Sequence, residues 1–131
     1  MNTLRNQTWL LLGASGGIGG ALLPLLITEG ATVLVAGRRA EALAALPGGD
    51  AVVPVTLDLG AADFSISLRQ LIDTHGVPDG VIHCAGANRF VAAEHNDDTT
   101  LRRLIDVNLT SALVLTRELL PAFRQRGSGT L

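Results

Sequence analysis

Apolar and polar residues alternate along this chain in blocks of two lengths. Short apolar runs predict β-strands over residues 8–12, 32–36, 51–56 and 81–84. Longer stretches predict α-helices over residues 17–29, 40–46, 61–75 and 98–126. Strands and helices that alternate in this way are typical of βαβ units, in which helices cover both faces of a parallel sheet. We therefore predict an α/β fold with a doubly wound parallel sheet, formed by residues 1–131 as a single domain.

Two prolines bear on this arrangement. Right-handed crossovers in the strand order 3-2-1-4 place the third strand at the edge of the sheet. Pro54 lies within that strand, and an edge strand tolerates the missing N–H group. Pro24 lies inside the first predicted helix, where it removes the hydrogen bond to the carbonyl of Gly20. We expect a kink in the helix at that point.

The last predicted helix is the most apolar of the four. Mainly apolar residues at steps of three and four predict one core-facing stripe, formed by Leu101, Leu104, Ile105, Leu109, Ala112, Leu113, Thr116, Leu120 and Phe123. Val107, Val114 and Leu115 fall outside this stripe. A helix that is apolar on more than one side either buries a second surface against a partner subunit or packs more loosely within one domain. The sequence leaves both alternatives open.

Composition and charge restrict the classes of function. Hydrophobic residues make up 47% of the chain, which is enough for a sizeable core. The net charge is −2 and the ten basic residues are scattered arginines, so we expect no nucleic-acid binding. Residues 7–28 carry no charge, but five glycines and Pro24 interrupt them, so we expect no membrane-spanning helix. The single cysteine, Cys84, cannot form an intrachain disulfide, which favours a cytoplasmic protein.

A glycine-rich segment follows the first predicted strand directly, and residues 13–19 read GASGGIG. Glycines at positions 13, 17 and 19 permit a tight turn, a close approach of the backbone to a pyrophosphate and close packing of helix on strand. The helix that follows offers free N–H groups and the positive end of its dipole. The segment therefore predicts a pyrophosphate site, with a purely structural turn as the alternative.

This segment resembles the TGxxxGxG motif of the short-chain dehydrogenase/reductase family, with Leu12 in place of the threonine. Further likenesses follow in family order: residues 57–59 (LDL) are similar to an acidic motif, residues 83–86 (HCAG) to the NNAG motif, and residues 107–110 (VNLT) to the segment with the catalytic asparagine. The resemblance covers essentially the whole chain. It implies a Rossmann-type fold and an NAD(P)-dependent oxidoreductase.

The end of the second predicted strand indicates which dinucleotide binds. NAD-specific sites of this kind carry an Asp or Glu about 20 residues beyond the glycine turn. Residues 36–39 here read AGRR. Two adjacent cations at the start of a helix repel each other and are disfavoured by the positive end of the helix dipole. A bound anion such as a 2′-phosphate would offset both repulsions. We therefore predict that NADP(H) is preferred over NAD(H), with Arg38 as the first contact of the 2′-phosphate, Arg39 as the second and Ser15 as the third. The alternative is that Arg38 and Arg39 are a solvated pair on the surface.

Together with the resemblance, these features define a set of site residues. The predicted cofactor-binding residues are Gly13, Ser15, Gly17, Ile18, Gly19, Arg38, Arg39, Asp58, Leu59, Ala85 and Gly86. By resemblance Asp58 would meet the adenine amino group, although by itself it reads as a turn or cap residue. Asn108 is the catalytic candidate, since an amide inside a helix requires hydrogen-bond partners or a bend. His83 and Cys84 replace the two family asparagines, and we expect backbone groups to satisfy His83.

The chain contains no tyrosine and no lysine. In the resembled family a Ser on a fifth strand and a YxxxK motif supply proton transfer. Residues 127–131 resemble the approach to that strand, so we expect a sheet truncated before its fifth strand.

The leading hypothesis is the cofactor-binding half of an NADP(H)-dependent oxidoreductase that acts on a small-molecule carbonyl or alcohol. The alternative is a non-catalytic dinucleotide-binding module, or a pseudoenzyme subunit acting through an oligomer interface. We further expect a homo-oligomer formed through the last helix, and we find no metal-ligand spacing.

Overall fold

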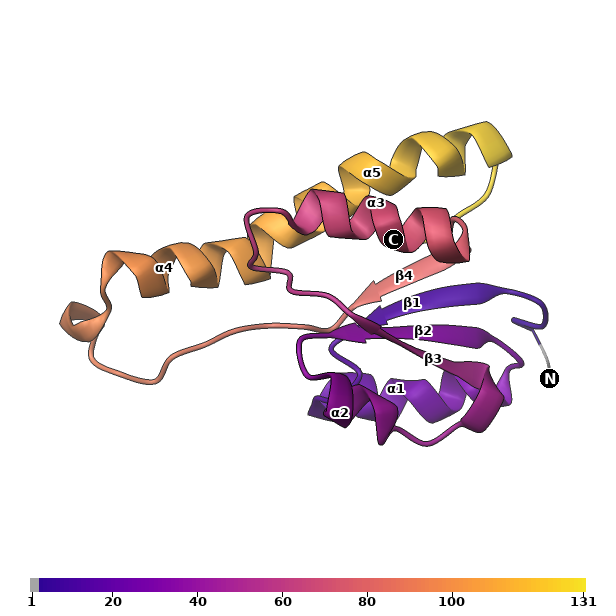
Figure 1. Cartoon of the computed structure of the whole chain (residues 1–131), viewed down its shortest axis with the longest axis horizontal. Helices are drawn as coiled ribbons and strands as arrows, with labels where there is room; N and C mark the ends of the chain where they lie inside the picture. Colours follow the sequence, from indigo (N-terminus) through magenta and orange to yellow (C-terminus); the bar gives the residue numbers. More distant parts are fainter. Residues whose placement is uncertain (1–2) are drawn as a thin grey trace.

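A computed structural model describes residues 3–131 as a parallel sheet between two layers of helices (Figure 1). The strands are β1 (Thr8–Leu12), β2 (Thr32–Gly37), β3 (Val52–Thr56) and β4 (Gly80–His83). Their order is β3-β2-β1-β4 and every pairing is parallel. The predicted fold class and the predicted strand order 3-2-1-4 are therefore confirmed.

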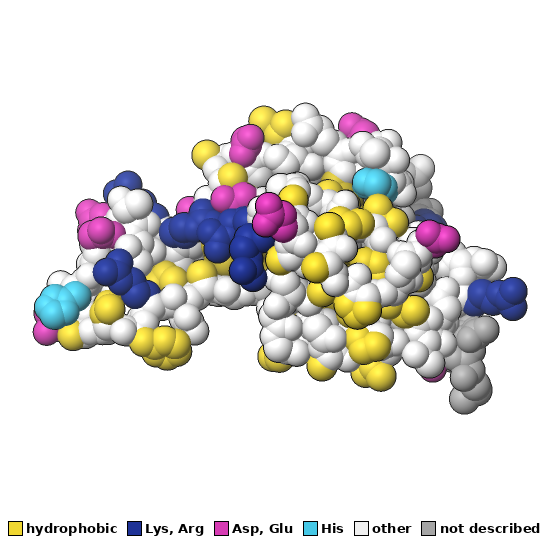
Figure 2. All heavy atoms as spheres, turned by 60° about the horizontal axis from the view of Figure 1, so that its bottom comes forward, with side chains coloured by type: hydrophobic (Ala, Val, Ile, Leu, Met, Phe, Trp, Pro, Cys, Tyr) yellow, Lys and Arg dark blue, Asp and Glu magenta, His cyan; other side chains and the backbone are white. Residues whose placement is uncertain are grey.

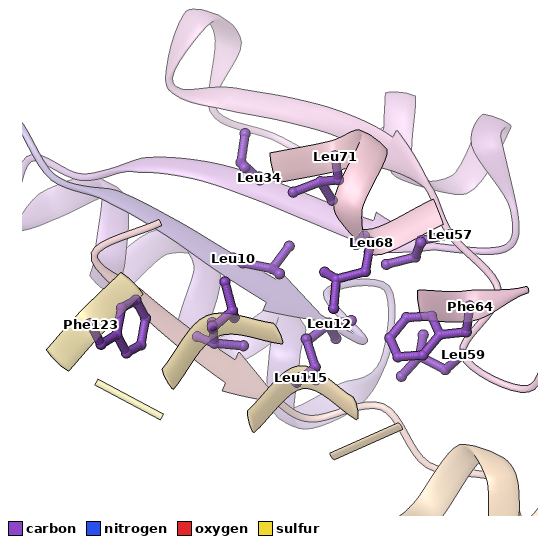
Figure 3. Packing of buried hydrophobic residues seen from close by; sticks show 13 residues of the cluster. Leu10, Leu12, Leu34, Leu57, Leu59, Phe64, Leu68, Leu71, Leu115 and Phe123 are labelled. Carbon is purple, nitrogen blue, oxygen red and sulfur yellow. The ribbon is translucent and has the colours of Figure 1, made fainter. Parts of the chain in front are cut away.

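Helices cover both faces of the sheet. Helices α1 (Gly17–Thr28) and α2 (Ala40–Ala44) lie on one face, and α3 (Phe64–His75) and α5 (Ser111–Arg126) lie on the other (Figure 1). Successive strand residues point to opposite faces, so Leu10 and Leu12 pack with α3 and α5 whereas Leu11 packs with α1. Figure 3 shows Leu10, Leu12, Leu68 and Leu115 converging between the sheet and these helices. Because both faces are buried, the inner strands are continuous apolar runs.

Several predicted boundaries move by a few residues. The third strand begins at Val52 after a short 3₁₀ turn, η1 (Gly49–Ala51), and the fourth strand begins and ends one residue earlier than predicted. Helix α2 ends at Ala44, ahead of a proline and two glycines. Helix α3 begins only at Phe64, because turn hydrogen bonds from Ala61 and Phe64 occupy the preceding residues. A second 3₁₀ turn, η2 (Ala93–His95), lies in the loop after β4.

The two prolines lie where the strand order and the helix prediction place them. Pro54 lies in β3 at the edge of the sheet and is exposed, as expected for a residue without an N–H group. Helix α1 continues through Pro24, and the hydroxyl of Thr28 donates to the Pro24 carbonyl at 2.8 Å. The kink at Pro24 stays a prediction. No helix formed by residues 3–131 combines the length and hydropathy that crossing a membrane requires.

The last predicted helix is divided into three parts, and its buried face was predicted wrongly. Helix α4 (Asp98–Ile105) passes into a π-helical turn, η3 (Asp106–Thr110), and then into α5. The buried residues recur at steps of four: Val107, Ser111, Leu115, Leu119 and Phe123. Most of the predicted stripe lies outside the core: Leu101, Ile105, Leu109, Leu113 and Thr116 are exposed, and Leu104, Ala112 and Leu120 are half-buried. The buried stripe was not predicted because it includes the polar residue Ser111, and the prediction was based on the spacing of mainly apolar residues.

The end of the chain lies beside β4. Thr130 forms an isolated parallel bridge with Gly80, and its N–H donates to the Asp79 carbonyl at 3.1 Å. Arg126 fixes this approach: it forms an ion pair with Asp79 at 3.4 Å and lies 5.2 Å from the centre of the Phe123 ring. Residues 127–131 therefore approach β4 as a fifth parallel strand would.

Glu118 joins α5 to α3, and its charge is expected to contribute to stability. Its carboxylate accepts two hydrogen bonds from Arg69, at 2.8 and 2.9 Å, and others from Arg117. These hydrogen bonds lower the pKa of Glu118 from 4.5 to about 2. A carboxyl group with a depressed folded-state pKa stabilises the fold above its unfolded-state value, and this contribution is lost as the pH falls from 4.5 towards 2.

Glu118→Gln is therefore expected to lower the free energy of unfolding at pH 7 by about 1 kcal/mol, since both arginines are largely exposed. The loss should shrink as the pH approaches 2. Urea unfolding at pH 7 and pH 3 measures both effects. Glu41→Gln, at an exposed glutamate of α2 outside any ion pair of the described chain, is the control. An unchanged pH dependence in the Glu118 variant would count against this role.

Candidate nucleotide-binding site

A cleft of about 250 Å³ opens at the carboxyl ends of the strands. The chain leaves β1 towards β2 on one side and returns to β4 on the other, so the cleft lies where the strand order reverses. The lining combines predicted residues with others that the sequence did not indicate: Gly13, Ser15, Gly16, Ala36, Gly37, Arg38, Arg39, Leu43, Asp58, Leu59, Cys84, Ala85, Gly86, Ala87, Arg103 and Val107. This is the place at which open α/β sheets bind their ligands.

The glycine turn brings three parts of the backbone into close contact. Gly13 has a φ of 86°, and a Cβ there would lie 2.6 Å from the backbone nitrogen of Ala85. A Cβ on Gly19 would collide with the carbonyl oxygen of Gly13. The turn itself is closed by a 3.0 Å hydrogen bond from Gly16 N–H to Gly13 O. The first strand, α1 and the residues after β4 can therefore meet only where side chains are missing.

The start of α1 has the features of an anion site. Gly16 caps the helix without a side-chain hydrogen bond, and no acidic residue lies in the first turn. The first helical hydrogen bond runs from Gly20 N–H to Gly16 O, so the N–H groups of residues 17–19 precede it. Gly17 and Ile18 are exposed, whereas Gly19 is buried in the contact with the turn. The positive end of the helix dipole thus borders the cleft.

Arginines gather at the mouth of the cleft. Arg38 and Arg39 follow the last residue of β2, and both are exposed and outside every ion pair within residues 3–131. Figure 2 shows basic side chains grouped where the projecting α4 segment meets the body of the molecule, and the arginines that line the cleft are Arg38, Arg39 and Arg103. The end of β2 carries no carboxylate.

Asp58 is the carboxylate of the cleft, and it is held by two donors. Its Oδ1 accepts a 2.8 Å hydrogen bond from Arg103 and a 3.0 Å hydrogen bond from Gly60 N–H. Partial burial favours the neutral acid, but the hydrogen bonds from Arg103 and Gly60 outweigh it and hold the pKa of Asp58 below its usual value. Asp58 is therefore an ionised acceptor at neutral pH.

Asn108 is exposed and lies outside the lining of the cleft. Its Oδ1 accepts from the N–H of Ala87 at 2.9 Å, and its Nδ2 donates to the carbonyl of Ala87 at 2.7 Å. Asn108 also lies in the middle of the π turn. The amide of Asn108 therefore has hydrogen-bond partners, and it also lies where the helix departs from regular α-helical geometry. Through Ala87, Asn108 fixes the backbone that leaves β4 and lines the cleft together with Ala85 and Gly86.

His83 contacts a side chain in addition to the backbone groups that were expected to satisfy it. Its Nε2 lies 2.7 Å from the hydroxyl oxygen of Ser111, and that hydroxyl also lies 2.7 Å from the Val107 carbonyl. The direction of the hydrogen bond between His83 and Ser111 depends on the tautomer of the imidazole: His83 donates through Nε2 when the hydroxyl hydrogen of Ser111 goes to Val107. The bond ties β4 to the buried stripe of α5. Since Ser111 is fully buried, this partner is one that local sequence could not indicate.

The His83 imidazole is expected to make stability pH-dependent. Burial lowers the pKa of His83 from 6.5, although nearby backbone carbonyls partly oppose the shift. The unfolded chain then binds more protons just below pH 6.5, so the free energy of unfolding falls as the pH drops from 6.5 towards the folded-state pKa. His83→Gln should remove this dependence in urea titrations between pH 7.5 and 5, and His75→Gln, at an exposed histidine, should retain it.

The chain matches a known protein family over nearly its whole length. The model of the family described as short chain dehydrogenase matches residues 7–131. The chain belongs to the short-chain dehydrogenase family. It spans about half the length of the curated relatives it matches.

Several relatives of this short-chain dehydrogenase chain are similar over nearly all of its length. An uncharacterized oxidoreductase of Myxococcus xanthus is 33% identical, covering 100% of the chain and 54% of the relative. The 3beta-hydroxysteroid dehydrogenase 2 of Eggerthella lenta is also 33% identical, covering 96% and 51% respectively. The names of both relatives describe oxidoreductases.

Solved structures agree with the fold. A metagenomic short-chain oxidoreductase in complex with NADP has a TM-score of 0.88 and 28% identity, covering 97% of this chain and 61% of that one. A 3-oxoacyl (acyl-carrier-protein) reductase from Agrobacterium tumefaciens with NADP bound has a TM-score of 0.86 and 26% identity, covering 98% and 52%. Both structures contain NADP.

The short-chain dehydrogenase cleft includes residues that were not among the predicted site residues: Gly16, Ala36, Gly37, Leu43, Cys84, Ala87, Arg103 and Val107. Cys84 and Ala36 lie at the ends of strands that point at the cleft, so their places could have been inferred from the strand ends. The position of Arg103 in the cleft could not be inferred in this way. It lies on a helix 45 residues beyond its partner Asp58.

Proposed function

We propose that this chain is the cofactor-binding part of an NADP(H)-dependent oxidoreductase of the short-chain type. The nicotinamide of the bound cofactor would exchange a hydride with the carbonyl or alcohol carbon of a small molecule. The observation that carries the proposal is the pair Arg38 and Arg39, which lines the same cleft as the glycine turn and has no carboxylate partner in the described chain.

The residues of the cleft fit a dinucleotide with three phosphate groups. The pyrophosphate would occupy the start of α1, where N–H groups of residues 17–19 are available and no acidic side chain opposes it. Arg38 would contact the 2′-phosphate first, with Arg39 and Ser15 as further donors. A 2′-hydroxyl would gain little from two cations, since an NAD site uses a carboxylate at this position.

Other residues of the chain would orient the cofactor. In the family resemblance Asp58 accepts from the adenine amino group, and Leu59 lines the same part of the cleft. Ala85 and Gly86 would border the middle of the dinucleotide, on backbone that Asn108 holds through Ala87. By the family resemblance, Asn108 would be the residue that this part of the enzyme contributes to catalysis. Because the sequence has neither tyrosine nor lysine, the proton donor for the substrate would come from another segment or subunit.

Parallel titrations with NADPH and NADH test this function. Trp9, the single tryptophan, lies in β1 and provides a fluorescence signal beside the emission of the reduced nicotinamide. We expect NADPH to bind about 10- to 100-fold more tightly than NADH, as one or two charge-assisted hydrogen bonds to a phosphate would give. Equal affinities, or tighter NADH binding, would contradict the preference. The absence of binding to either would contradict the function itself.

We also propose that a second copy of the chain covers the exposed apolar face of α4 and α5. Leu101, Ile105, Leu109 and Leu113 recur at steps of four on that face and expose about half of their surface each. Leu113→Asp is expected to convert an oligomer into a monomer in sedimentation velocity, because it places a charge in the contact. Ile66→Asp, at a similarly exposed position on α3, is the control. A wild-type monomer at tens of micromolar would overturn this proposal.

A further inference from the structure

Arg103 lies at an unusual place for a surface cation. It projects from α4, which extends away from the sheet (Figure 1), and reaches back to Asp58 in the loop after β3. Both side chains line the cleft and each is only about one-third exposed, at 36% for Arg103 and 39% for Asp58. The neighbouring Arg102 on the same helix is exposed and outside every ion pair within residues 3–131.

The chain leaves room for this contact. A Cβ at Gly60 would lie 2.5 Å from Nη1 of Arg103 and 3.1 Å from a methyl carbon of Val107. Gly60 therefore does two things: its N–H donates to Asp58, and its missing side chain admits the guanidinium. Two donors, Arg103 on α4 and Gly60 in the loop that carries Asp58, thus converge on a single carboxylate oxygen.

That convergence distinguishes the two oxygens of Asp58. Oδ1 accepts from both Arg103 and Gly60, whereas Oδ2 accepts no hydrogen bond from residues 3–131. Two donors on one oxygen fix the plane of the carboxylate, and Oδ2 stays available to a donor on a ligand in the cleft. The lining around it includes Leu59 and Val107, which suit the faces or edges of a flat ring.

We propose that Arg103 is a positioning residue for purine recognition: it holds Asp58 so that Oδ2 selects a ring bearing an exocyclic amino group. The proposal rests on the proposed function, since it concerns the adenine end of the same dinucleotide. Arg103 itself acts through Asp58. Without Arg103 only Gly60 would hold the carboxylate, which could then rotate and discriminate less.

The two donors on Oδ1 predict how the side chain of an Asp58→Asn variant would be oriented. In Asp58→Asn the single carbonyl oxygen must face Arg103 and Gly60, because both are donors. The NH₂ group then takes the place of Oδ2 and opposes the adenine amino group. In an Asp58→Asn/Arg103→Gln double variant the amide is freer to turn its oxygen to the ligand. The effect of Asp58→Asn on the preference for the adenine amino group should therefore be larger when Arg103 is present than when it is replaced. A double-mutant cycle with Asp58→Asn and Arg103→Gln measures this difference.

The experiment compares NADPH with deamino-NADPH, in which a carbonyl replaces the adenine amino group, through the fluorescence of the reduced nicotinamide. The quantity measured is the ratio of the two dissociation constants. We expect Arg103→Gln to reduce the wild-type preference for NADPH about three- to tenfold. Gly60→Ala, which displaces the guanidinium without changing the charge, should reduce it similarly, and Arg103→Lys should restore part of it. Arg102→Gln, the matched control on the same helix, should leave the ratio unchanged.

The outcomes separate the inference from the function on which it rests. A reduced ratio in Arg103→Gln, together with a smaller effect of Asp58→Asn when Arg103 is absent, supports the positioning role. If Arg103→Gln weakens both nucleotides by the same factor, Arg103 is merely structural and the inference is overturned while the function stands. If the wild-type chain binds neither nucleotide, the proposed function fails and the inference fails with it.

Discussion

Gly19→Ala is expected to abolish tight NADPH binding and to destabilise the fold. The added Cβ would collide with the carbonyl oxygen of Gly13 and approach Ala14, both of which are backbone atoms that cannot rotate away. Helix α1 would have to move off the turn, and the N–H groups at its start would move with it. Overpacking of this kind costs about 1–3 kcal/mol, and we expect NADPH affinity to fall more than about tenfold. Urea unfolding and NADPH titration measure the two effects.

The adjacent glycines offer a matched control. A Cβ on Gly20 would meet its nearest atom, the carbonyl oxygen of Ala14, at an ordinary 3.5 Å, and one on Gly17 would meet nothing within 4 Å. Gly20→Ala should therefore keep the NADPH affinity and add a few tenths of a kcal/mol to about 1 kcal/mol of stability, because alanine favours helix. If Gly19→Ala and Gly20→Ala behave alike, the close approach of Gly19 to the turn has no functional importance.

Replacing both Arg38 and Arg39 by serine is expected to weaken NADPH binding by about 10- to 100-fold. Neither arginine has an ion-pair partner within residues 3–131, so their removal should cost little stability. Their effect should be confined to the ligand that carries the 2′-phosphate. Fluorescence titration of the double variant with NADPH and NADH tests both statements.

NADH serves as the internal control for that variant, because it lacks only the 2′-phosphate. Its affinity should change by less than about threefold, since long-range attraction to the remaining phosphates is screened by salt. Arg102→Ser controls for the loss of positive charge near the cleft. An equal loss for NADPH and NADH would show that the arginines attract any anion and do not recognise the 2′-phosphate.

The sheet could be predicted from sequence because its signals are local. Strands buried on both faces are short apolar runs, and the glycine turn follows the first of them directly. Pro54 indicated the edge strand, and the rule of right-handed crossovers supplied the order. The glycine turn and the arginine pair were correctly expected on neighbouring strand ends, so the structure brings them to one cleft.

Contacts across long sequence distances could not be predicted in this way. The buried stripe of α5 passes through Ser111, whose hydroxyl is satisfied by Val107 and His83, and no periodicity of apolar residues reveals a buried serine. The Asp58–Arg103 pair likewise depends on where α4 lies once the chain has folded. Each case is a polar group whose partner is supplied by tertiary structure.

The most direct measurement is an NMR titration of the ¹⁵N-labelled chain with adenosine 2′,5′-bisphosphate, the part of NADP that carries the 2′-phosphate. We predict that the amide signals of Gly13, Ser15, Arg38 and Arg39 shift together and saturate with one affinity. The amide signals of the groove at the end of α5 should stay unchanged; its lining residues are Leu120, Phe123, Arg124, Gly127, Ser128, Gly129 and Leu131. Shifts confined to that groove, or no saturable shift near the glycine turn, would contradict an NADP(H) site in this cleft.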